Sequence, residues 1–209
     1  MPRTRRFVLA ILMALLAVGS FATIASADDA AMPTGFKTET LAWFKDAEEK
    51  LIALAEATPE SKYSYRPSKD VRSTGEVFMH VASGNYGLGS AAFGFEPPAN
   101  YNLNTYEKSL TKKADIVAAL KSSFAAMEAG FAAVPDDGWG KPVTLPFMKS
   151  TVLGTSLLLL SHVHEHLGQS IAYARGAGIV PPWTAAQQAA AAKEAAEKKK
   201  AETAAASKK

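Results

Sequence analysis

The sequence predicts an all-α protein, a four-helix bundle whose last helix carries most of the histidines. Four segments of twenty-odd residues repeat apolar residues at the three- and four-residue spacing of an amphipathic helix. No run of alternating apolar and polar residues rich in β-branched side chains indicates a strand. Three of the chain's four histidines fall within residues 161–169 of the fourth segment, which makes that segment the candidate functional element.

The first 27 residues are predicted to be a cleaved secretory signal peptide. A start with three arginines precedes an apolar run over residues 7–18, and Ala25-Ser26-Ala27 supplies a small-residue cleavage signal. An uncleaved membrane anchor is the alternative, but polar residues after position 18 dilute the run below a good spanning segment. We therefore expect an exported protein, periplasmic or extracellular, that starts at Asp28 and has no stable membrane span.

The charge and the absence of cysteine exclude several classes of protein. Removal of the signal peptide leaves 20 basic and 20 acidic residues. Residues 28–183 hold 14 basic and 17 acidic residues, so the predicted domain is slightly acidic and has no basic cluster that would indicate nucleic-acid binding. Without cysteine, disulfides, thiolate metal ligands and a lipoprotein anchor are excluded.

The first two helices have clear boundaries in the sequence. Residues 36–57 form the first, with an apolar face that includes Phe44, and Pro59 stops it. Ser73-Thr74-Gly75-Glu76 matches a capping box, in which the serine caps the helix and the glutamate reaches back. We therefore expect the second helix to begin there and to run to about residue 92.

Two glycines in the second helix lie on the face of its histidine. Gly84 and Gly87 follow His80 by four and seven residues. Each costs up to about 1 kcal/mol relative to alanine in a helix interior. Either they leave a hollow beside the histidine, or they allow close packing of another helix. The sequence favours neither interpretation.

The second half of the chain contains two more helices and a tail. The third helix is predicted over about residues 111–134, followed by an extended loop over residues 139–147. The fourth begins near Ser150 or Thr151 and ends near Arg175, before glycines and a proline pair. Residues 184–209 are rich in alanine and lysine without an apolar stripe, which favours a disordered tail over an exposed helix.

The histidines suggest a metal site inside the bundle. His162 and His166 are four residues apart, so a helix places them on one face as a two-nitrogen clamp, while His164 points to nearly the opposite side. His80 is the candidate third ligand, although a lone histidine is more often a satisfied core residue. Three protein ligands leave a coordination position of the metal open for water or substrate, which is typical of catalytic sites. Imidazole ligands suit Zn, Ni, Cu and Fe alike, so the ligands do not select the metal.

Two further residues fall on the same face of the fourth helix as the histidine pair. Gln169 and Tyr173 follow His166 by three and seven residues. Their side chains can bond a substrate or hold the helix in register, and the sequence leaves both interpretations open.

A second motif overlaps the histidine pair. Residues 162–166 also fit H-x-x-E-H, the signature of inverted zinc peptidases, with Glu165 as the general base. That fold places an acidic third ligand well downstream, and here only three glutamates follow, all in the low-complexity tail. A peptidase is therefore the weakest of the alternatives.

Two blocks of sequence resemble the DinB-like superfamily (DinB/YfiT type). The first runs from Tyr65-Arg66-Pro67 through the capping box to His80, and the second from His162 to Gln169, followed by Tyr173, Arg175, Gly178 and Pro181-Pro182. The resemblance covers about residues 36–183. It implies a bundle in up-down-down-up order, a metal, commonly Ni or Zn, bound by His80, His162 and His166, and a homodimer. Some similar proteins are transferases or isomerases that use small thiols.

These features together predict an exported DinB-like metal-binding protein that acts as a hydrolase or transferase on a small molecule if it is an enzyme. A non-catalytic metal-binding or stress-related module is the alternative. It predicts a site that is closed by a fourth protein ligand or packed over by side chains. The signal peptide and the basic tail depart from the family pattern, and export argues against a cytosolic thiol as co-substrate.

Overall fold

The computed structural model describes residues 35–206. The predicted signal peptide, its cleavage site and residues 207–209 lie outside the described residues. The four bundle helices are α1 (Phe36–Ala57), α2 (Thr74–Phe93), α3 (Lys113–Ala133) and α4 (Val152–Gly176). Their bounds fall within about two residues of those predicted from the sequence.

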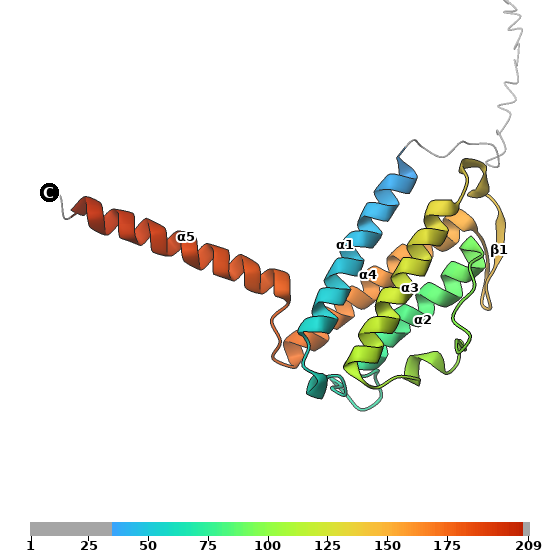
Figure 1. Ribbon diagram of the computed structural model, residues 1–209, viewed down its shortest axis with the longest axis horizontal. Helices are drawn as coiled ribbons and strands as arrows, with labels where there is room; N and C mark the ends of the chain where they lie inside the picture. The colour runs from blue at the N-terminus through green and yellow to red at the C-terminus, as the bar shows by residue number, and fades with distance from the viewer. Residues whose placement is uncertain (1–34, 207–209) are drawn as a thin grey trace, which may run out of the picture. The chain divides into compact units, whose positions relative to one another are not determined.

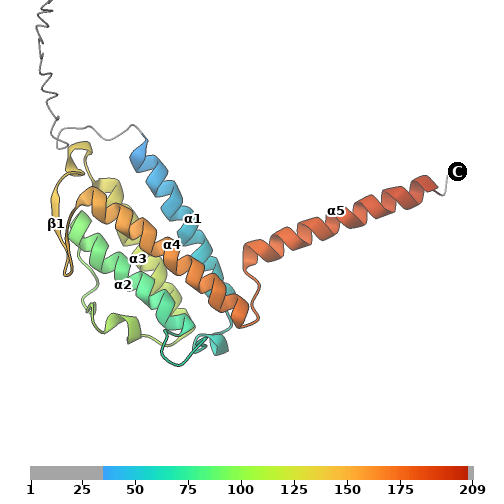
Figure 2. The same cartoon turned by 180° about the vertical axis from the view of Figure 1, so that it is seen from behind.

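The helices form a bundle with an unusual order of directions. Helices α1 and α4 run one way and α2 and α3 the other, which is the up-down-down-up order that the resemblance implies (Figures 1 and 2). Because α2 and α3 are parallel, the chain between them returns along the bundle through residues 94–112. This return segment includes the short helix η3 (Tyr106–Lys108), which lies against α2.

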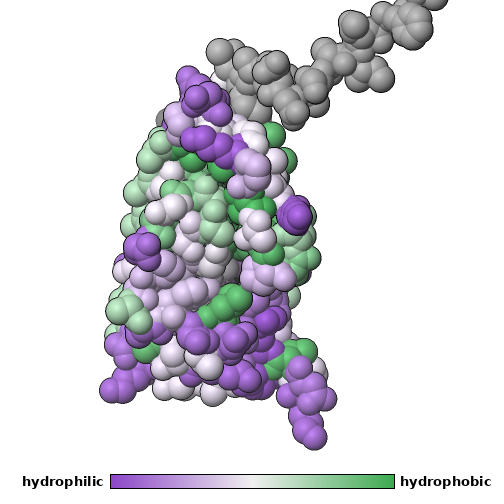
Figure 3. All heavy atoms as spheres, turned by 90° about the vertical axis from the view of Figure 1, so that its right-hand side faces the viewer, coloured by the Kyte–Doolittle hydropathy of each residue, from purple (hydrophilic) through white to green (hydrophobic). Residues whose placement is uncertain are grey.

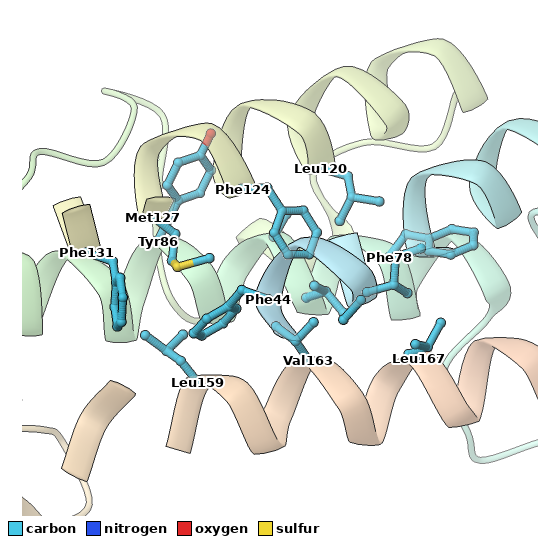
Figure 4. Packing of buried hydrophobic residues seen from close by; sticks show 14 of the residues in the cluster. Phe44, Phe78, Tyr86, Leu120, Phe124, Met127, Phe131, Leu159, Val163 and Leu167 are labelled. Atoms are coloured by element: carbon cyan, nitrogen blue, oxygen red, sulfur yellow. The ribbon is translucent and has the colours of Figure 1, made fainter. Parts of the chain in front are cut away.

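All four helices contribute to one apolar core (Figure 4). Helix α3 is the one described helix that is long and apolar enough to span a membrane by length and composition. Its apolar stripe is buried against the other helices, as expected for the core helix of a bundle. The largest fully buried side chains include Phe44, Leu51, Phe78, Met79, Leu120, Phe124, Met127, Phe131 and Leu159.

The start of α2, which positions His80, is fixed by the capping box. Ser73 Oγ accepts a hydrogen bond from the amide of Glu76 at 3.2 Å, and Glu76 Oε2 accepts one from the amide of Ser73 at 2.9 Å. Arg66 holds both carboxylate oxygens of Glu76, at 2.6 and 2.7 Å. The loop before α2 is therefore tied to the first turn of the helix, and the predicted capping box is confirmed.

The prediction of an extended loop after α3 is wrong in one respect. Strands β1 (Pro142–Thr144) and β2 (Lys149–Thr151) form an antiparallel hairpin in which Val143 pairs with Ser150. Strands of three residues are too short to show an alternating pattern, so the sequence gives no strand signal here. The last strand residue, Thr151, also caps α4, since its hydroxyl accepts from the amide of Gly154 at 3.1 Å.

A fifth helix, α5 (Pro182–Ala206), occupies the tail, for which the sequence favoured disorder. Its first residue is a proline, which suits the first helical position because that amide needs no partner within the helix. Trp183 packs against the bundle core, and residues 185–204 are exposed. High helix propensity of alanine and lysine, rather than burial, accounts for this helix.

Candidate metal centre

Three histidines from two helices meet inside the bundle. His80, two turns into α2, and His162 and His166, on successive turns of α4, each offer a ring nitrogen within 4.8 Å of the others. Ring centroids are 4.6 Å apart for His80 and His166 and 4.5 Å apart for His162 and His166. The structure thus brings together the three residues that the sequence singled out.

An acidic residue from the return segment orients His80. Glu107, in η3, accepts a hydrogen bond from His80 Nδ1 through Oε2 at 2.9 Å. Its other oxygen lies 3.0 Å from Nε of Arg72 in an ion pair. Because a carboxylate only accepts, Nδ1 of His80 must carry the proton and Nε2 keeps a free lone pair.

A side-chain relay on α4 orients His166 in the same way. Gln169 Oε1 accepts from His166 Nδ1 at 2.7 Å, and Gln169 Nε2 donates to the hydroxyl of Tyr173 at 3.1 Å. The ring of Tyr65 packs edge-on against Tyr173 at 6.4 Å. This relay again places the proton on Nδ1 and leaves Nε2 free. Gln169 and Tyr173 are thus bonded to each other and to His166 along one face of α4.

The third ring, His162, faces His80 directly. Their Nε2 atoms are 3.2 Å apart, and His162 Nδ1 is buried with no hydrogen-bond partner among residues 35–206. Two nitrogen ligands at about 2.0–2.1 Å from one tetrahedral ion would be about 3.3 Å apart, close to the observed separation. The spacing therefore fits two ligands of a single divalent ion.

Burial favours the neutral forms of His162 and His80. It lowers the pKa of His162 to about 3, with further contributions from His166, His80 and Arg72. Burial is also the main reason that the pKa of His80 is lowered, and Arg72 adds to it, while Glu107 opposes it. Neutral imidazole is the form that binds metal, so the environment favours the metal-competent state.

The glycines of α2 make room for side chains and leave no hollow. A Cβ atom on Gly84 would lie 2.9 Å from Nδ1 and 3.1 Å from Nε2 of His162, so the ring occupies the space of the missing side chain. A Cβ atom on Gly87 would lie 2.6 Å from the hydroxyl of Tyr101. Neither glycine leaves a hollow. Close packing of another helix is the right interpretation at Gly84, where the ring of His162 on α4 fills the space, whereas at Gly87 the neighbour is Tyr101 of the return segment.

The other two residues of the motif lie apart from the cluster. His164 bonds through Nδ1 to the carbonyl of Leu160 at 2.9 Å, and its ring packs against Trp43 on α1 at 6.3 Å. Glu165 is exposed and does not belong to the ligand group. An inverted zinc peptidase needs this glutamate at the metal, so the structure gives that alternative no support.

An open pocket of about 580 Å³ borders the cluster. Glu107 and Gln169 belong to its wall and also contact the histidines, so one layer of side chains separates pocket from rings. His80 keeps 26% of its side chain exposed, and no fourth His, Asp or Glu of the described chain joins the ligand group. The pocket is lined by Arg66, Lys69, Asp70, Val71, Arg72, Glu76, Glu107, Lys108 and Gln169.

Sequence reasoning missed Glu107 and Arg72. Neither belongs to a periodic pattern, because one lies in the return segment and the other just before α2. The parallel order of α2 and α3 was the available signal. It requires the return segment to pass along α2, so an acidic residue there can reach the helix that carries His80.

We predict that Glu107→Ala weakens metal binding by roughly 10–100-fold, because the partner that fixes the ring and proton of His80 is lost. Glu107→Gln keeps an oxygen acceptor and should recover part of the loss. Competition with a chromophoric chelator measures the affinity. Glu96→Ala, which removes an exposed glutamate from the first part of the return segment, is the control and should bind metal normally. Equal affinity of Glu107→Ala and wild type would contradict the role of Glu107.

Comparison with known proteins supports the same fold. The sequence profile of the DinB superfamily matches residues 44–170, a range that contains all three histidines. A DinB-like protein from Bacillus cereus is similar in structure, with 14% identity, a TM-score of 0.59 and coverage of 69% of this chain and 95% of the other. No match was found among curated proteins.

Two further solved structures carry functional descriptions. YfiT from Bacillus subtilis, described as a probable metal-dependent hydrolase with an unusual four-helix bundle topology, has 14% identity, a TM-score of 0.56 and coverage of 69% of this chain and 89% of its own. A mycothiol-dependent maleylpyruvate isomerase has 13% identity and a TM-score of 0.51. The match covers 63% of this chain and 59% of the isomerase chain. These likenesses show the fold, and the profile match over most of the bundle shows the family: the chain belongs to the DinB superfamily.

Proposed function

We propose that the chain binds a divalent metal ion through His80, His162 and His166 and uses it for hydrolysis or group transfer on a small molecule. The convergence of the three rings carries this proposal. Two of them have Nδ1 committed to Glu107 and Gln169, so their Nε2 lone pairs remain available. His80 Nε2 lies 3.2 Å from Nε2 of His162, and a cation bound by all three rings would engage these nitrogens together.

The residues around the rings support a catalytic use of the site. A divalent ion held by three imidazoles supplies Lewis-acid chemistry, which activates water and polarises a substrate oxygen. Glu107 and Gln169 keep the rings in place while the substrate binds. The description of YfiT as a metal-dependent hydrolase favours hydrolysis, and the thiol-dependent isomerase makes group transfer the second reaction class to test.

Several features of the proposal rest on the sequence. We propose zinc or nickel as the metal because three-imidazole sites suit both ions. The N-terminal pattern supports an exported protein that acts in the periplasm or outside the cell, with residues 28–183 as the mature domain. We also propose a homodimer, on the basis of the family resemblance alone.

A non-catalytic metal-binding module is the second candidate. One observation favours it: Glu107 and Gln169 separate the histidines from the pocket, and His162 is enclosed by Gly84 of α2. A substrate must then pass these side chains, or approach at the exposed part of His80, to reach the ion.

Elemental analysis and an activity screen test the proposal together. The full chain is purified without added chelator, and its zinc and nickel are measured per chain. Metal-loaded and chelator-stripped samples are then compared on chromogenic esters, amides and phosphate esters. We expect one equivalent of metal and hydrolysis that disappears on stripping and returns on reloading. One equivalent without metal-dependent turnover would favour the non-catalytic module, and a chain that takes up no metal would refute both.

A further inference from the structure

We infer that the open pocket beside the histidine cluster binds the anionic group, a carboxylate or a phosphate, of a small organic acid or phosphate ester. That this molecule is the substrate rests on the proposed function. The anion site itself rests only on the pocket's own residues. These comprise four basic and three acidic side chains, of which most are already committed to one another.

One arginine–glutamate pair in the pocket is structural. Arg66 donates to both oxygens of Glu76 and to the carbonyl of Val71 at 2.5 Å. These bonds tie the loop to the start of α2, and they hold the pKa of Glu76 below its usual range. Neither side chain of this pair is available to a ligand without loss of the capping arrangement.

The second pair is only half committed. Glu107 uses one oxygen for His80 and the other for Nε of Arg72. No nitrogen of the Arg72 guanidinium group makes a hydrogen bond in the described part of the chain: Nε contacts Glu107 only as an ion pair, and the side chain is 37% exposed. A guanidinium group binds two oxygens of one carboxylate or phosphate in parallel, so Arg72 can hold an anion while it remains paired with Glu107.

Two lysines give the pocket its surplus positive charge. The ammonium groups of Lys69 and Lys108 have no ion pair or hydrogen bond among residues 35–206, and both side chains are exposed. Once the two arginine–glutamate pairs are set aside, only Asp70 opposes them. The pocket is thus net basic within a domain that is slightly acidic overall, which favours a negatively charged ligand.

The position of the pocket connects the anion to the proposed reaction. Hydrophilic side chains gather at the lower end of the face shown in Figure 3, the end at which the segment before α2 lies in Figure 1. Glu107 and Gln169 place a bound anion one side chain away from the histidine rings. The rest of a small molecule held there can extend toward His80, the histidine whose partner Glu107 lines the pocket.

Calorimetric titration of the full chain with inorganic phosphate and, separately, succinate tests the site. Measurements at low ionic strength, on metal-loaded and chelator-stripped protein, compare wild type with Lys69→Ala/Lys108→Ala. These lysines bond to no other side chain, so the fold should be retained. We expect the double substitution to raise Kd by roughly tenfold in both metal states, and added salt to weaken binding through screening. The probe that binds more tightly identifies the anionic group as carboxylate or phosphate.

Lys141→Ala/Lys149→Ala is the matched control, since it removes two exposed lysines of the β1–β2 hairpin that lie outside this pocket. It should leave Kd unchanged. The inference would be overturned if neither phosphate nor succinate bound, or if Lys69→Ala/Lys108→Ala bound them with the same Kd as the wild type. Binding that needs metal and ignores the lysines would also overturn it, while it supports the proposed function. Lysine-dependent binding by a chain that takes up no metal would support the anion site and refute the proposed function.

Discussion

Replacing His162 with alanine is expected to abolish stoichiometric metal binding. The ring contributes one of three converging nitrogens and faces His80 at 3.2 Å between Nε2 atoms. Without it, only His80 and His166, on different helices, remain as ligands, and two ligands do not form the three-histidine site. The effect should exceed the roughly 10–100-fold loss expected when only an orienting partner such as Glu107 is removed. Elemental analysis after dialysis against trace-metal-free buffer measures the stoichiometry.

His164→Ala is the matched control for this experiment. It removes the same kind of side chain from the same helix, two residues away, but the His164 ring packs against Trp43 and bonds to Leu160. We expect this variant to bind metal as the wild type does. Circular dichroism should show that both variants keep their helices. Full metal content in His162→Ala, or a loss confined to His164→Ala, would rule out the three-histidine site.

The bundle and the histidine cluster could be predicted because their signals are local. The apolar spacing of α1 and the capping box at Ser73 each depend on residues within one or a few turns, and both agree with the structure. The separation of His162 and His166 by four residues likewise fixes their common face. That His80 faces them follows from the packing of α2 against α4. From the residues alone His80 is only a candidate third ligand, and the family resemblance adds the expectation that it joins the pair.

The features that escaped prediction depend on distances between elements. Glu107 reaches His80 because the return segment passes beside α2, and no spacing rule connects residues 27 positions apart. The β1–β2 hairpin is too short to show a period. For α5, the alanine- and lysine-rich composition is compatible with both an exposed helix and a disordered tail. At Gly84 the choice between a hollow and close packing depended on where the His162 ring lies, which only the assembled bundle decides.

Gly84→Ala is expected to weaken metal binding by more than about tenfold and to destabilise the bundle. The new Cβ atom would lie within 3.1 Å of both nitrogens of the His162 ring, so the ring or one of the two helices must move. Overpacking of this kind typically costs about 1–3 kcal/mol, against a gain of up to about 1 kcal/mol from alanine's higher helix propensity. Chelator competition measures the metal affinity, and urea unfolding of the stripped protein measures the free energy of unfolding.

Gly168→Ala separates the effect of helix propensity from that of crowding. Gly168 lies on α4 between His166 and Gln169, but a Cβ atom there would have no neighbour within 4 Å. This variant should gain up to about 1 kcal/mol in free energy of unfolding and bind metal normally. If Gly84→Ala gained the same stability with unchanged metal affinity, α2 and α4 could separate without penalty. The missing side chain at Gly84 would then not determine where His162 lies, and the geometry of the three rings would depend on Glu107 and Gln169 alone.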